Sequence, residues 1–260
     1  MERDGAVAFS NLFPPAVLKR ARREVLRRHA SGELLKRGLV RDIAGRRTSV
    51  LPFEGPFLER AFYANPRVLA AMAALLGSDF CIGSLEAVIA LPGAYDQHQH
   101  IDGPIRFDRT IGRRKTPYAG DFSGLPPYAV GLAVPLCDVD EENGPTAIWA
   151  GSHRTSLRAR PPGARETARK HRVELMTGPF GHAYAFDYRT FHGGTANRSR
   201  DERPLLMLVF TRAWFRDPNQ NEVFPSVVIS RRNLAKVPAR HRGLFLLAPA
   251  ARRTLWEGKW

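Results

Sequence analysis

The 260-residue chain has only two cysteines, no long hydrophobic run and fewer acidic than basic residues. Cys81 and Cys137 cannot cross-link a fold of this size, which excludes the disulfide-rich secreted class and predicts a reducing compartment. No segment approaches the roughly 20 consecutive apolar residues that span a bilayer, and the N-terminal residues 1–13 lack the apolar core of a signal peptide. We therefore expect a soluble, cytoplasmic protein with no membrane contact.

The shortage of acidic residues leaves a formal net charge of +15, although 43% hydrophobic residues exclude a disordered basic protein. Residues 1–50 hold twelve basic and five acidic residues, and residues 213–260 hold nine and three. Basic ends of this kind are compatible with nucleic-acid binding. The chain has no zinc-finger spacing and no aromatic RNA-binding signature, so we expect no nucleic-acid partner.

Apolar periodicity predicts helices first and strands afterwards. A helix is expected over 14–37, with an earlier stop at Ser31-Gly32, and a second over 65–76, which Asn65 caps. After Gly77 the pattern changes to short apolar segments rich in β-forming residues, at 80–91, 128–136, 182–188 and 204–214. The sequence therefore predicts an all-β core behind N-terminal helices.

The remaining segments complete a single domain over 1–260. It comprises a helical part (1–77), a β core (78–214) and a C-terminal extension (215–260). Within the core, the Gly-, Pro- and Arg-rich residues 103–127 are expected to form a long loop, a candidate lid over a site. In the extension, an edge strand is expected at 227–229, and 244–249 is expected to pack on the core or on a neighbouring subunit.

The densest chemical cluster is Gln-His-Gln-His-Ile-Asp at 97–102. On an extended strand His100 and Asp102 project from the same face, so an imidazole nitrogen and a carboxylate oxygen reach one ion. A distant histidine, His182 or His192, would complete a two-histidine, one-carboxylate face that suits non-haem Fe(II). Catalytic zinc is the competing metal, and His98 with His100 is a competing ligand pair.

Three blocks in order resemble the phytanoyl-CoA dioxygenase family of Fe(II)/2-oxoglutarate oxygenases, over about residues 80–214. They are 97–102; 135–146 with 151–153; and 185–194 followed by Asn197 and Arg203. The resemblance implies a mainly β fold with α-helices, a double-stranded β-helix (jelly roll, cupin-like) core with the N-terminal helices packed outside. It also implies Fe(II), 2-oxoglutarate as cosubstrate and O2.

The resemblance also assigns residues. Gln97, three places before His100, favours His100 over His98 as the first iron ligand, with Asp102 and His192 as the others. Arg203, eleven residues after His192, matches the arginine that binds the far carboxylate of 2-oxoglutarate.

Other residues receive smaller roles. Tyr128 is expected to bind the cosubstrate through its hydroxyl group, and Asp187 to cap the turn before His192. Gly151-Ser152-His153 is expected to be structural, and His182 to pack or to form a pocket wall. Trp149 either lines the pocket or packs in the core. The expected substrate-pocket residues are Gln97, His98, Trp149 and Arg106.

The predicted reaction oxidises an unactivated C–H bond of a small metabolite or natural-product intermediate, releasing succinate and CO2. Because related halogenases replace the carboxylate ligand with a small residue, Asp102 favours hydroxylation or another oxidation over halogenation. The net +3 charge of residues 103–127 is compatible with an anionic or carrier-tethered substrate or with a solvated loop. The alternatives are a catalytically silent β-helix protein that binds nucleic acid or a protein partner through its basic ends, and a zinc hydrolase.

Overall fold

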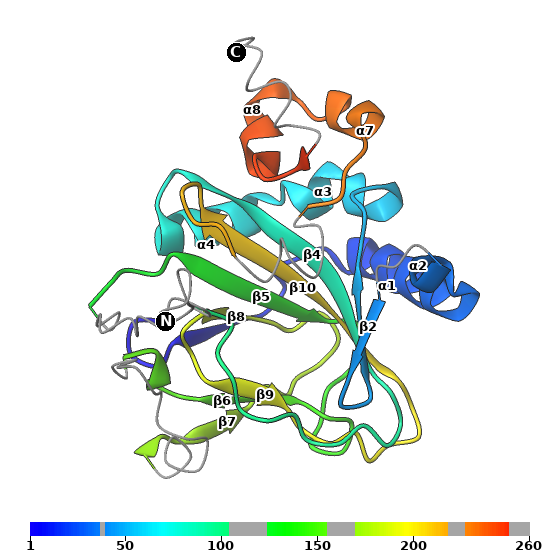
Figure 1. Ribbon diagram of the computed structural model, residues 1–260, viewed down its shortest axis with the longest axis vertical. Helices are drawn as coiled ribbons and strands as arrows, with labels where there is room; N and C mark the ends of the chain where they lie inside the picture. Colours follow the sequence, from blue (N-terminus) through cyan, green and yellow to red (C-terminus); the bar gives the residue numbers. More distant parts are fainter. Residues whose placement is uncertain (37–39, 104–123, 155–169, 218–226, 250–260) are drawn as a thin grey trace, which may run out of the picture.

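The computed structural model describes residues 1–36, 40–103, 124–154, 170–217 and 227–249, and two antiparallel sheets form its centre (Figure 1). The larger sheet has the strand order β1-β8-β5-β10-β4-β3-β2, and the smaller sheet has the order β7-β6-β9. The larger sheet consists of β1 (Ala6–Phe9), β2 (Val40–Ile43), β3 (Arg46–Val50), β4 (Phe80–Ala90), β5 (Ala129–Pro135), β8 (Ala183–Asp187) and β10 (Arg203–Arg212). The smaller sheet consists of β6 (Thr146–Trp149), β7 (Val173–Leu175) and β9 (His192–Gly194).

The helices lie outside this pair of sheets, on the side of the larger sheet that faces away from the smaller one (Figure 1). The α-helices are α1 (Pro15–Ser31), α2 (Glu33–Lys36), α3 (Arg60–Tyr63), α4 (Pro66–Leu76), α7 (Arg231–Ala235) and α8 (Ala239–Arg242). Short 3-10 turns are η1 (Gly55–Leu58), η2 (Ser152–Arg154) and η3 (Gly243–Phe245). The predicted jelly-roll core with external N-terminal helices is confirmed.

Local sequence explains the two longest helices. In α4 the Asn65 side chain accepts hydrogen bonds from the backbone N–H groups of Arg67 and Val68 at 2.9 and 3.3 Å, and Pro66 occupies the first position. Helix α1 ends at Ser31, and Gly32 caps it with a φ of 63°, the left-handed conformation that glycine adopts without strain. The earlier of the two predicted stops is therefore the one observed.

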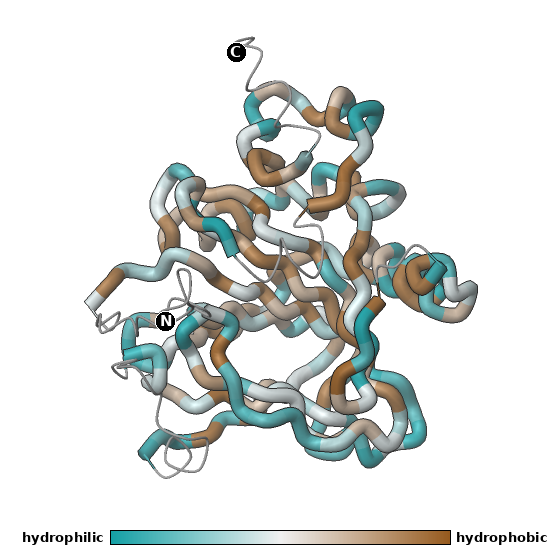
Figure 2. The backbone as a smooth tube through the Cα atoms, viewed as in Figure 1, coloured by the Kyte–Doolittle hydropathy of each residue, from teal (hydrophilic) through white to brown (hydrophobic). Residues whose placement is uncertain are grey.

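The largest apolar cluster lies between the larger sheet and these helices. Val17, Leu18, Ala21 and Val25 of α1 are buried there, and α1 and α4 both contact β10. Figure 2 shows the hydrophobic stretches along the strands of this sheet and in the segments packed on it, whereas the loops at the lower right are largely hydrophilic. One face of the larger sheet thus packs against the helices in the core, and its other face is available for a binding site.

The four predicted core strands are confirmed as β4, β5, β8 and β10, but the N-terminal part also contributes β1, β2 and β3 to the larger sheet. The expected edge strand at 227–229 is wrong: Val227 is buried, and the carbonyl of Val228 accepts a hydrogen bond from the N–H of Phe53 at 2.7 Å, without a strand. The 244–249 segment packs on the core, where the ring centroids of Phe245 and Phe53 are 5.0 Å apart. Within the described ranges, no helix is long and apolar enough to cross a membrane.

Candidate metal centre

A cavity of about 370 Å³ lies between the two sheets. Side chains of β2, β3, β4 and β10 form its wall on the larger sheet, and β6, β9 and the segment 97–102 close the other side. That segment runs antiparallel beside β9. His100 and His192 exchange two backbone hydrogen bonds of 3.0 and 2.9 Å, which brings residues 92 positions apart into direct register.

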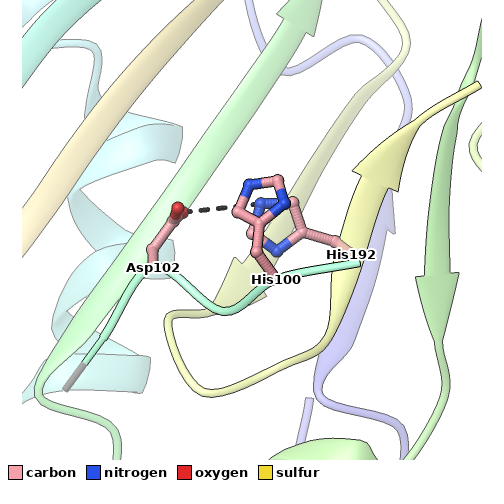
Figure 3. Close-up of side chains that lie close together, drawn as sticks. All are labelled: His100, Asp102 and His192. Carbon is pink, nitrogen blue, oxygen red and sulfur yellow. Dashed lines mark ion pairs between the residues drawn. The ribbon is translucent and has the colours of Figure 1, made fainter. Parts of the chain in front are cut away.

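His100, Asp102 and His192 converge on one point of this cavity (Figure 3). Their candidate ligand atoms all lie within 4.8 Å of one another, and Asp102 Oδ2 is 3.7 Å from His192 Nε2. The two imidazole rings have centroids 4.4 Å apart. Two imidazoles and one carboxylate gathered on one side of the cavity could hold a metal ion and would leave its other coordination positions open.

Hydrogen bonds fix which nitrogen each histidine presents. His100 Nδ1 lies 2.9 Å from the carbonyl oxygen of His98, and His192 Nδ1 lies 3.0 Å from that of Thr190. Because a carbonyl only accepts, each Nδ1 carries the proton and donates it, and each Nε2 keeps its lone pair. A metal-bound histidine typically donates its other ring N–H to a carbonyl in this way.

The His100 imidazole is also held in its neutral form. Burial and the neighbouring His192 lower the pKa of His100. Since a neutral imidazole is the form that ligates a metal, the environment prepares this residue for coordination before an ion arrives.

Arg203 supplies the cationic end of the cavity. Its side chain, which begins β10, is 2% exposed, and its Nη2 donates to the carbonyl oxygen of Gly144 at 2.7 Å. Its Nε and Nη1 groups are buried and have no hydrogen-bond partner among the described residues. Burial lowers the pKa of Arg203, yet a guanidinium stays charged at neutral pH. Two orphaned N–H groups of a buried cation fit a carboxylate.

Gly144 is required for this arrangement. Its φ of 84° is left-handed, and a Cβ at this position would lie 2.8 Å from the carbonyl oxygen of Thr195. The turn at Asn143-Gly144 therefore positions the carbonyl that orients Arg203.

Arg46 is a cavity residue that the sequence interpretation missed. It lies on β3, is 1% exposed, and donates through Nη1 to the carbonyl oxygen of Tyr95 at 2.6 Å and through Nη2 to that of Thr195. Its Nε has no partner among the described residues. Burial and the nearby charge of Arg203 lower the pKa of Arg46 to about 10, so both cations persist at neutral pH. The sequence pattern predicted no strand around Arg46, so nothing in the sequence distinguished this residue from other arginines of the basic N-terminal part.

A sequence profile of the phytanoyl-CoA dioxygenase family matches residues 1–205. The chain belongs to this family. Ectoine dioxygenase of Halomonas elongata is 26% identical over 229 residues, covering 77% of this chain and 66% of that protein. L-proline trans-4-hydroxylase of Streptomyces griseoviridis is 28% identical over 137 residues, covering 43% and 50%. The matches therefore span between half and just under two thirds of these relatives.

Solved structures show the same fold at low identity. EctD from S. alaskensis, crystallised with 2-oxoglutarate and 5-hydroxyectoine, has a TM-score of 0.64 and 21% identity, covering 81% of this chain and 73% of its own. The epimerase SnoN, in complex with Fe3+, alpha-ketoglutarate and nogalamycin RO, has a TM-score of 0.62 and 19% identity, covering 81% and 80%. These likenesses support the jelly-roll architecture assigned above.

Two of the predicted substrate-pocket residues, Gln97 and His98, line the cavity. The Gln97 side-chain oxygen accepts a hydrogen bond from the N–H of Gly194 at 2.9 Å, so this residue anchors 97–102 to β9 as well as lining the cavity. His98 lines the cavity beside His100 and contributes the carbonyl that orients it.

Tyr128 and Trp149 are not among the residues that line this cavity. The Tyr128 ring packs 4.7 Å from that of Phe215, centroid to centroid, with Arg189 5.7 Å away over its face, so this position does not support the predicted contact with a cosubstrate. Trp149 packs in a cluster with Phe191 and Ile101. Of the two predictions for Trp149, pocket lining or core packing, the structure therefore favours core packing. Arg106 lies outside the described residues.

The residues expected to be structural contact the turns around the site. Asp187 Oδ1 accepts the backbone N–H of Arg189 at 2.9 Å, which is the predicted turn cap. Ser152 Oγ accepts the N–H of Phe191 at 2.8 Å, and His153 Nε2 lies 3.1 Å from the carbonyl oxygen of Glu2. His182 packs against Gly178, away from the cavity lining.

Proposed function

We propose that this protein is an Fe(II)- and 2-oxoglutarate-dependent dioxygenase that hydroxylates an unactivated C–H bond of a small metabolite. The observation that carries the proposal is the combination of His100, Asp102 and His192 with the buried, partly unpaired guanidinium of Arg203 in one cavity. Family membership and the names of the two relatives support the same reaction class.

Different residues would bind the metal and the cosubstrate. Nε2 of His100, Nε2 of His192 and the carboxylate of Asp102 would hold Fe(II). Arg203 would bind the far carboxylate of 2-oxoglutarate through its orphaned N–H groups. When bound, iron, 2-oxoglutarate and O2 supply the oxidative decarboxylation that couples C–H oxidation to the release of succinate and CO2.

The protein contributes charge and orientation. Arg46 adds positive charge beside Arg203, so the two arginines form the anionic-ligand end of the cavity. Leu205, Met207 and Val209 of β10 add apolar side chains to the wall, beside the acidic Glu86 and Asp217. A substrate held along this wall would present one C–H bond to the metal.

The cavity volume of about 370 Å³ suits a small molecule, and ectoine and proline are the first compounds to test because the relatives' names contain them. Natural-product intermediates and anionic or carrier-tethered substrates form the next group. We further propose that the chain is one domain and acts in the cytoplasm.

The test is a turnover assay of the full chain with Fe(II), 2-oxoglutarate and isotopically labelled O2. We expect succinate formation that requires both iron and 2-oxoglutarate, a labelled hydroxyl group in the product, and no activity in Asp102→Ala. Asp42→Ala is the matched control, because Asp42 is an exposed carboxylate on β2 outside the cavity lining.

Two results would contradict the proposal. One is iron-loaded protein that forms no succinate with any compound and none in slow substrate-free turnover. The other is activity with Zn(II) that is indifferent to 2-oxoglutarate, which would support the hydrolase alternative. Salt-sensitive nucleic-acid binding that persists in Asp102→Ala, with no turnover, would support the silent alternative.

A further inference from the structure

The turn between β8 and β9 contains a buried ion pair outside the metal site. The side chains of Asp187 and Arg189 are 1% and 3% exposed. Arg189 Nε donates to Asp187 Oδ1 at 2.8 Å and Arg189 Nη2 to Oδ2 at 2.7 Å, which is a bidentate pair. The backbone N–H of Arg189 also donates to Oδ1, so one carboxylate fixes both the side chain and the backbone of the turn.

Two carbonyl groups of this turn hold metal ligands. The carbonyl oxygen of Tyr188 accepts the backbone N–H of Asp102 at 3.0 Å. The carbonyl oxygen of Thr190 accepts Nδ1 of His192 at 3.0 Å. These carbonyls flank Arg189 on either side, so the direction of both depends on the backbone conformation that the ion pair holds.

Arg189 and Thr190 also connect the turn to distant parts of the chain. Arg189 Nη1 donates to the carbonyl oxygen of Leu125 at 2.7 Å, and its guanidinium lies over the ring of Tyr128. Thr190 Oγ1 donates to the carbonyl oxygen of Gly5 at 3.0 Å. The turn is thus fixed from several directions, as a precise ligand site requires.

We propose that Asp187 and Arg189 are positioning residues for the metal centre, acting through the carbonyls of Tyr188 and Thr190 to set metal affinity. A buried ion pair adds little to stability compared with apolar side chains of similar volume, so stability alone does not account for it. The inference rests on the proposed function only in requiring that the site binds a divalent metal.

The experiment is a titration of the metal-free full chain with Co(II), followed by calorimetry and by the visible absorption of the bound ion. The main variant is Asp187→Asn with Arg189→Gln, which removes both charges and leaves no unpaired buried ion. Loss of a hydrogen bond that orients a metal ligand typically weakens metal binding by about 10- to 100-fold, and we expect a rise of that size in the Co(II) Kd with an altered spectrum.

Two further variants separate positioning from folding. Arg189→Lys keeps the charge but lacks the planar fork, so its Co(II) Kd should fall between those of the wild type and the double variant. Arg28→Gln is the matched control: Arg28 is 4% exposed and pairs with Glu24 and Glu54 on the far side of the larger sheet. It should lower the thermal midpoint and leave the Co(II) Kd unchanged.

The proposal is overturned if the double variant binds Co(II) with the wild-type Kd and spectrum, or if Arg28→Gln raises the Kd equally. If the double variant does not fold, a wild-type Kd and spectrum in Arg189→Lys overturns it. If the Co(II) Kd values follow the predicted order but the wild type forms no succinate, the oxygenase function alone is contradicted. If the wild type forms succinate but the variants leave the Co(II) Kd unchanged, the positioning role alone is contradicted.

Discussion

The two faces of strand β10 are built for different purposes. Arg203, Leu205, Met207 and Val209 line the cavity, whereas the alternate residues Leu206, Leu208 and Phe210 belong to the apolar core beneath the helices. Successive side chains of a strand point to opposite faces, so a single segment serves both. The core face is uniformly apolar, but the cavity face carries a buried cation, Arg203, with unpaired N–H groups. Stability resides on one face and ligand binding on the other.

The largest effect should come from removing a metal ligand on the cavity side. We expect His192→Ala to weaken divalent-metal binding by more than roughly 100-fold, the largest loss typical of residues that only orient a ligand, since one of three protein ligands is lost. Calorimetric titration with Co(II) measures this. His182→Ala is the control. His182 packs on Gly178, so the variant should bind Co(II) with the wild-type affinity. Equal loss in both variants would show that the ligand set is wrong.

Adjacent leucines of β10 test the comparison directly. Leu206→Ala should lower the free energy of unfolding by about 2–5 kcal/mol, because Leu206 is fully buried in the core, and should leave 2-oxoglutarate affinity unchanged. Leu205→Ala removes part of the cavity wall and enlarges the cavity, so it should change 2-oxoglutarate affinity more than the free energy of unfolding. Urea unfolding and anaerobic binding isotherms measure the two quantities. The comparison fails if both variants lose stability and affinity in the same proportion.

Arg203 should show opposite effects on stability and on binding. A hydrogen bond to a charged group contributes about 1.5–3 kcal/mol, so Arg203→Gln should weaken 2-oxoglutarate binding by about 10- to 100-fold. The same change should leave the thermal midpoint of the ligand-free protein unchanged or higher, since it removes a buried cation. A lower midpoint with unchanged affinity for 2-oxoglutarate would exclude the assigned role.

The smallest effect concerns acid stability on the helix side. Hydrogen bonds from Arg27 and Arg28 lower the pKa of Glu24 in α1 to about 2. A carboxylate with a depressed folded-state pKa contributes stability that is present above its unfolded pKa, about 4.5, and is lost as the pH falls toward 2. Glu24→Gln should therefore flatten the dependence of the free energy of unfolding on pH in this window. The same dependence in wild type and variant would disprove the assignment.

Strand alternation predicted the pair His100 and Asp102, and the family resemblance assigned His192 and Arg203. All four residues line the cavity. Arg46 escaped prediction since its strand lies far upstream and only tertiary pairing brings it beside Arg203.

Side-chain direction explains the other differences. Tyr128 stands one residue before β5 and turns toward Phe215 and Arg189 instead of the cavity. Val227 and Ile229 are buried and Val228 is half-buried, but the three residues do not pair as a strand, a difference that hydropathy alone does not distinguish. Packing among distant segments decides such cases, and no local pattern records it.

The most direct test of the account is an anaerobic titration of the full chain with Fe(II) and then 2-oxoglutarate, followed by visible absorption. A keto acid chelated to Fe(II) gives a charge-transfer band. We predict this band in the wild type, at higher 2-oxoglutarate concentrations in Arg203→Gln, and not at all in His192→Ala. A wild type that binds Fe(II) but develops no band with 2-oxoglutarate, or a band unchanged in His192→Ala, would contradict the assignment of this cavity as the cosubstrate and iron site.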